Sequence, residues 1–120
     1  MDAGNTLHPA RRVAPALDRA RDAGSVIGAD RYAGDQVLFY LGAPAQIIRK
    51  PSKMGAFLRA GERNLLVLRS THYEETAPFL PPGTQPLAHW GTPEAGYIVV
   101  GVSSAPAEVI ESLATRGDRE

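Results

Sequence analysis

Residues 46–69 read QIIRKPSKMGAFLRAGERNLLVLR, and this stretch decides the predicted fold. Its two ends, residues 46–49 and 64–69, are short and rich in Ile, Leu and Val, as is typical of buried strands. Between them, residues 52–60 carry apolar side chains at helical spacing, and Gly61 favours the end of a helix there. A strand, a helix and a second strand in this order predict two parallel strands joined by a right-handed crossover.

The segments before this stretch continue the alternation of helix and strand. Residues 9–23 predict a helix, although Pro15 favours a start near Ala14. Residues 25–29 predict a short buried strand. Residues 34–41 fit either a strand or a short buried helix, and we favour the helix.

The segments after it complete the pattern. Residues 71–80 predict a short helix, in which Thr71 and Glu74 form a capping box. Residues 85–90 and 96–103 predict two strands that pair antiparallel through a turn. We therefore expect an α/β fold, a small three-layer α/β/α sandwich whose mixed sheet has about five strands and a C-terminal antiparallel pair.

Length and composition limit the organisation of the chain. Its 120 residues fit one domain, and we expect a flexible lead over 1–8, a single α/β domain over 9–104, and a terminal helix with a frayed tail over 105–120. The sequence has no cysteine, which excludes a disulfide framework and a zinc–thiolate site. No apolar run approaches the roughly 18–20 residues that span a bilayer, so the chain as given is expected to be soluble.

The sequence lacks the motifs of the common catalytic and cofactor sites. His8, His72 and His89 have no metal-ligand spacing, and there is no GxSxG, GxxxxGK[ST] or GxGxxG motif. Ser70 and Thr71 stand beside His72, but neighbouring residues at a strand–helix junction rarely align for nucleophilic attack. We therefore predict no catalytic residue, no metal and no cofactor.

The loop after residues 25–29 is the expected binding surface. Ligands of parallel α/β sheets favour the carboxyl ends of the strands, and this loop carries Asp30, Arg31 and Tyr32. A small enzyme that used the loop would need a cleft with convergent polar groups.

The formal net charge is zero, but the charge is divided unevenly along the chain. Residues 1–70 hold 11 Lys and Arg against 6 Asp and Glu, whereas residues 71–120 hold 2 against 7. Solvated loops and helix ends are the ordinary interpretation. The sharper one is a basic face for lipid headgroups or a phosphorylated carrier, with contacts from Arg49, Lys50 and Lys53. We expect no nucleic-acid partner, because the aromatic residues are not interleaved with the basic ones.

Four segments in succession resemble a known type of domain: RRVAPALDRARDAG (11–24), VLFYLGAPAQII (37–48), PSKMGAFLRAGERNLLVLRS (51–70) and the stretch from THYEET to GVSS (71–104). They are similar to the soluble C-terminal domains of bacterial GT-C type membrane glycosyltransferases, the dolichyl-phosphate-mannose-protein mannosyltransferase-like and aminoarabinose-transferase-like enzymes. The family often has Arg before the proline of the second segment, where this chain has Ala43 before Pro44. If that arginine has a role in the family, this chain lacks it.

The resemblance implies a non-catalytic accessory domain on the extracytoplasmic (periplasmic) face of the inner membrane. Such enzymes move a sugar from a polyprenyl-phosphate donor, using acidic residues in loops between membrane helices. This chain contains neither, so no catalytic residue carries over. Its implied partners are the membrane portion of the parent enzyme and the lipid-phosphate carrier, and it would pack on that portion or help to position an acceptor.

The residues also fit a stand-alone small α/β binding or interaction module of unknown ligand. A complete short gene would favour that module, whereas upstream apolar segments of about 20 residues would favour the accessory domain.

Overall fold

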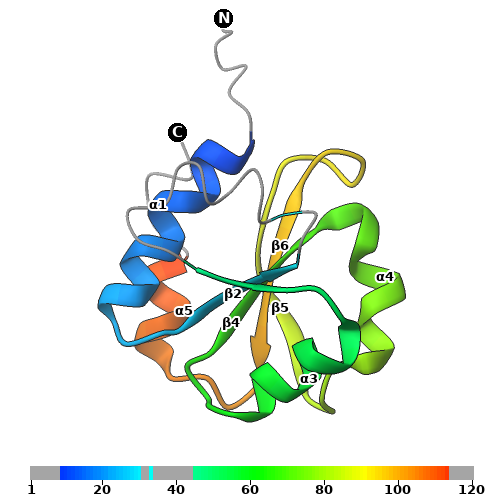
Figure 1. The fold of residues 1–120 in the computed structure, drawn as a ribbon. Helices are drawn as coiled ribbons and strands as arrows, with labels where there is room; N and C mark the ends of the chain where they lie inside the picture. Colours follow the sequence, from blue (N-terminus) through cyan, green and yellow to red (C-terminus); the bar gives the residue numbers. More distant parts are fainter. Residues whose placement is uncertain (1–8, 31–32, 34–44, 114–120) are drawn as a thin grey trace, which may run out of the picture.

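The computed structural model describes residues 9–30, 33 and 45–113 of the chain (Figure 1). Within them one sheet contains five strands: β2 (Ile27–Asp30), β3 (Gln46–Ile48), β4 (Leu65–Arg69), β5 (Thr84–Trp90) and β6 (Tyr97–Val102). The helices of this part are α1 (Pro9–Asp22), α3 (Pro51–Arg59), α4 (Tyr73–Thr76) and α5 (Ala107–Leu113). Two 3₁₀ turns, η1 (Ser70–His72) and η2 (Ala77–Phe79), flank α4.

The sheet has the order β3-β2-β4-β6-β5. Strands β3, β2 and β4 are parallel, and β6 runs antiparallel to both β4 and β5. Helix α3 joins β3 to β4, so the stretch 46–69 forms the predicted strand–helix–strand unit. Pro86 lies in β5, where an edge strand can tolerate the missing N–H, and the register shifts beside it. The predicted mixed sheet with a C-terminal antiparallel pair is confirmed.

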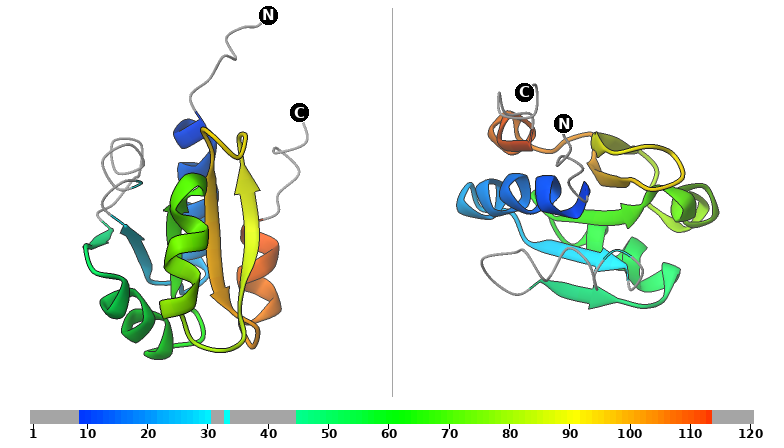
Figure 2. Two further views of the ribbon diagram at one scale, coloured as in Figure 1. Left: turned by 90° about the vertical axis from the view of Figure 1, so that its right-hand side faces the viewer. Right: turned by 90° about the horizontal axis from the view of Figure 1, so that it is seen from above.

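Helices cover both faces of the sheet (Figure 2). α1 and α5 pack on one face, where Leu17 and Val109 join the larger apolar core. α3 and the segment from η1 to η2 cover the other face, where Met54, Leu58 and Leu80 form a second core. These layers confirm the predicted α/β/α arrangement in the described part of the chain.

Helix α1 begins at Pro9, earlier than Pro15 alone would suggest. Pro15 lies inside the helix and is exposed, while the opposite stripe is buried. The helix ends in a Schellman motif, in which Gly24 adopts φ 102°, and the N–H of Ser25 donates to the carbonyl of Ala20 over 3.0 Å. The predicted terminator at Gly24 is therefore confirmed.

The prediction of one capped helix over residues 71–80 is wrong. The segment divides into η1, α4 and η2, and the N-cap of α4 is His72, which makes no side-chain capping bond. Pro78 explains part of the division, because it has no N–H to donate to the carbonyl of Glu74. The capping box between Thr71 and Glu74 does not form.

The helix expected over residues 34–41 lies outside the described residues. Among the helices that are described, none combines the length and the apolar character needed to cross a bilayer.

Gly55 sets how closely α3 approaches η2. A methyl group at this position would collide with the backbone carbonyl oxygen of Phe79, which a side-chain rotation cannot relieve. Met54 precedes Gly55 in α3, and Thr76 ends α4 directly before η2, so the close approach also limits the space between these two residues, which line one cavity.

We predict that Gly55→Ala destabilises the fold by about 1–3 kcal/mol, because backbone must shift to admit the methyl group. This loss is the net change that remains after the roughly 1 kcal/mol by which alanine favours a helix over glycine. Urea unfolding measures the difference. Ala56→Ser, at an exposed position of the same helix, serves as the control and should stay within about 0.5 kcal/mol. A Gly55→Ala variant as stable as the parent would contradict the packing described.

Candidate functional site

The sheet order creates a gap between the connections that leave β2 and β4. These two strands are parallel neighbours, but the chain leaves β2 toward β3 at one edge and leaves β4 toward β5 at the other. Such a switch point leaves a crevice beyond the carboxyl ends of the strands, where ligands of open α/β sheets bind. The topology therefore locates a candidate site before any side chain is considered.

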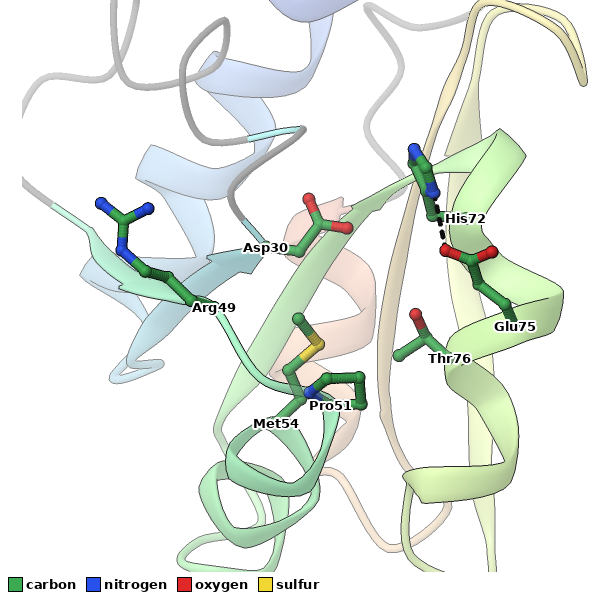
Figure 3. Close-up of a pocket in the computed structure, with 7 residues that line it drawn as sticks. All are labelled: Asp30, Arg49, Pro51, Met54, His72, Glu75 and Thr76. Carbon is green, nitrogen blue, oxygen red and sulfur yellow. Dashed lines mark hydrogen bonds and ion pairs between the residues drawn. The ribbon is translucent and has the colours of Figure 1, made fainter.

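A cavity of about 140 Å³ occupies this position, on the face covered by α3 and α4. Its described lining comes from the ends of all three parallel strands: Asp30, Arg49, Pro51, Met54, His72, Glu75 and Thr76 (Figure 3). Met54 and Pro51 supply apolar surface, and the other five residues are polar or charged. We call this cavity the switch-point crevice.

Asp30 ends β2 with its side chain toward the crevice (Figure 3). Alternation along the strand places it there, because Ile27 and Ala29 belong to the core under α1, while Gly28 faces α3. Asp30 is only 2% exposed, and its Oδ1 accepts a hydrogen bond from the backbone N–H of Ala33 over 2.7 Å. The carboxylate thus satisfies the backbone N–H of Ala33 as well as lining the crevice.

The opposite wall comes from the segment after β4. His72 Nδ1 and Glu75 Oε2 lie 2.9 Å apart, with the two side chains 28% and 68% exposed. A pair this exposed contributes little to folding, but it holds the imidazole in one orientation. Thr76 is 4% exposed, and its hydroxyl makes no bond to the other six residues drawn in Figure 3.

A second, shallower hollow of about 330 Å³ runs along the outer edge of β3. Its described lining contains Arg49, Lys50 and Lys53, all exposed, and no acidic residue. We call these three residues the basic edge. Arg49 lines both this hollow and the switch-point crevice, so the two are adjacent.

The site residues predicted from the sequence lie in two places in the described structure. It places Asp30 in the crevice, and it brings Arg49, Lys50 and Lys53 together at one edge. Arg31 and Tyr32 lie outside the described residues. Within the described part of the chain, no cluster of three His, Asp or Glu side chains could hold a metal ion.

Sequence reasoning missed the wall formed by His72, Glu75 and Thr76. The sequence pattern indicates neither a contact between His72 and Glu75 nor a role for Thr76, and it offers only Ser70 and Thr71 as candidate nucleophiles beside His72. The structure pairs His72 with Glu75 and leaves the Ser70 hydroxyl buried with no hydrogen-bond partner. Ligands favour the carboxyl ends of parallel strands, and this preference holds for the strand predicted over 64–69 as well as for the one over 25–29. Applied to both strands, it predicts a binding role for the segment that follows residue 69.

Comparisons with protein-family models, curated proteins and solved structures found no match to this chain. The class of molecule is therefore defined by its own features, a small α/β sandwich with a polar crevice at the switch point and a basic edge beside it.

We predict that Asp30→Ala lowers the free energy of unfolding by about 1–3 kcal/mol, because the buried N–H of Ala33 loses its acceptor. Asp30→Asn keeps an acceptor oxygen and should cost clearly less. Urea unfolding measures both, and Asp22→Ala, at an exposed position of α1, is the control. Equal losses for the two Asp30 variants would contradict the role assigned to this hydrogen bond.

Proposed function

We propose that this chain is the extracytoplasmic, non-catalytic accessory domain of a polyprenyl-phosphate-sugar-dependent membrane glycosyltransferase. In this proposal the basic edge meets an anionic surface, either lipid headgroups or the phosphate of the carrier. The domain then packs against the membrane portion of its parent enzyme or helps to position the acceptor.

The observation that carries the proposal is the clustering of Arg49, Lys50 and Lys53. The chain as a whole is neutral, yet these three exposed cations surround a hollow whose described lining has no acidic residue. Arg49 and Lys50 follow β3, and Lys53 lies in the first turn of α3, so one strand–helix junction positions all three. The local field at this edge is therefore positive despite the zero net charge.

The expected strength of this contact suits an accessory role. Each Lys or Arg near an anionic membrane contributes about 1 kcal/mol, so three contribute about 3 kcal/mol, and the attraction decays within about 10 Å. A contact of this size is weak and reversible on its own. It becomes effective when the parent enzyme holds the domain beside the membrane, because the effective concentration is then high.

The proposal assigns no step of sugar transfer to this chain. The sequence carries no recognised nucleophile or phosphate-loop motif, and the resemblance places the acidic catalytic residues in other parts of such enzymes. The domain would act by position and by charge, so its variants should change acceptor use or membrane contact and leave the chemistry of the parent enzyme intact.

We predict that Lys50→Gln combined with Lys53→Gln lowers binding to anionic vesicles by about 30-fold at low salt, because two cations are lost. The bound fraction is measured by sedimentation with vesicles in which about 30% of the lipid is anionic phosphatidylmethanol, a share that gives the membrane a strong negative surface charge.

The control combines Arg12→Gln with Arg59→Gln, which removes the same charge from exposed positions of α1 and of the far end of α3. It should reduce binding only slightly. Equal retention on neutral vesicles, or an equal loss in the control, would remove the electrostatic basis of the proposal.

A stand-alone binding module is the second candidate, and the polar switch-point crevice favours it. The two candidates predict different genes. An accessory domain requires upstream coding sequence for several apolar segments of about 20 residues in the same reading frame. Sequencing the gene upstream of Met1 decides between them, since an in-frame stop codon directly before Met1 would support the stand-alone module.

A further inference from the structure

We propose that the switch-point crevice and the basic edge form one site for a phosphate ester that carries hydroxyl groups. The phosphate lies on the basic edge, and the hydroxyl groups enter the crevice between Asp30 and Thr76. This inference deepens the proposed function, because the same basic edge that meets an anionic surface holds the phosphate here.

The position of Arg49 connects the two halves of the site. Asp30 pairs in register with Ile48, and Arg49 is the next residue after Ile48. Neighbouring strands lie about 4.8 Å apart, a separation that a three-carbon phosphate ester can span. Arg49 also lines both hollows, so a ligand that contacts this residue can reach into each of them.

The two halves offer complementary chemistry. The basic edge supplies only cations to a ligand, through the Arg49 guanidinium and the Lys50 and Lys53 ammonium groups. The crevice contributes acceptors, because the Asp30 carboxylate and the Thr76 hydroxyl line it, and Glu75 adds a second carboxylate that already contacts His72. A ligand that matches both has an anionic end and an end with several O–H donors.

The buried carboxylate also fixes the orientation of the ligand. Of the charged groups that line the crevice, Asp30 is buried whereas Arg49 is exposed and belongs to the basic edge. A phosphate at the buried end would be repelled by the Asp30 carboxylate, and like charges repel strongly where water is scarce. A neutral hydroxyl group meets no such repulsion and can donate to the carboxylate. The phosphate is therefore held at the basic edge, and Met54 and Pro51 offer apolar contact to the carbon atoms between the two ends.

Two matched probes test this arrangement with the full 120-residue chain. sn-Glycerol 3-phosphate and n-propyl phosphate have the same three-carbon skeleton and the same phosphate, but only the first carries hydroxyl groups. NMR titration of the ¹⁵N-labelled chain should show that glycerol phosphate binds roughly tenfold more tightly, since it adds hydrogen bonds to a charged acceptor. Equal affinities, or no binding of either probe, would overturn the inference.

Two variants test the crevice itself. Thr76→Val should remove much of the preference for glycerol phosphate and leave the binding of propyl phosphate unchanged, whereas Thr71→Val, at an exposed position outside the lining, should change neither. Asp30→Asn should reduce the same preference and raise the affinity for propyl phosphate, because the repulsion is lost. If Asp30→Asn weakened the binding of both probes equally, the proposed orientation of the ligand would be contradicted. Asp30→Asn also tests the crevice if Thr76→Val does not fold.

The hydroxylated phosphate could belong to a lipid headgroup or to a free metabolite, and vesicles distinguish these sources. Phosphatidylglycerol and phosphatidylmethanol carry the same charge, but only phosphatidylglycerol has hydroxyl groups in its headgroup. Preferential sedimentation with phosphatidylglycerol indicates a lipid ligand, whereas equal binding to both lipids together with the preference for glycerol phosphate indicates a free ligand. Equal binding to both lipids without that preference overturns the inference and leaves the proposed function standing.

Discussion

Burial of β4 on both faces is the constraint on which the rest of the structure depends. Leu65, Leu66, Val67 and Leu68 are all fully buried, so alternate side chains of this strand require helical cover on each side of the sheet. α1 and α5 cover one face, and α3 with the segment from η1 to η2 covers the other. A strand covered in this way must lie inside the sheet, between β2 and β6.

The same constraint produces the candidate site. With β4 in the interior, β2 becomes its parallel neighbour, and the connections leaving the two strands diverge toward opposite edges. The crevice that remains can hold polar groups that a packed core excludes, which explains why Asp30 and Thr76, two of the few buried polar residues in the described part, both line it. The candidate site thus lies at the carboxyl ends of the parallel strands, whereas β4 itself is apolar from Leu65 to Leu68.

The sequence predicts the layers well and the site only in part. The strand–helix–strand unit over residues 46–69 is predictable because apolar periodicity and burial agree there. Asp30 is predictable because it follows a buried strand. Glu75 and His72 are not, since the same residue types also favour a helix start, and their position in the crevice depends on how η1 and α4 pack beside the sheet. The contribution of Arg49 to two hollows depends on strand register, which local sequence does not specify.

The central claim is that the basic edge and the switch-point crevice act as one site. A crystal structure of the chain soaked with sn-glycerol 3-phosphate tests this claim most directly, because it locates both ends of the ligand at once. The account predicts the phosphate against Arg49 and Lys53 and at least one hydroxyl within hydrogen-bond distance of Asp30 or Thr76. A phosphate bound elsewhere, or hydroxyl groups that point into solvent, would contradict it.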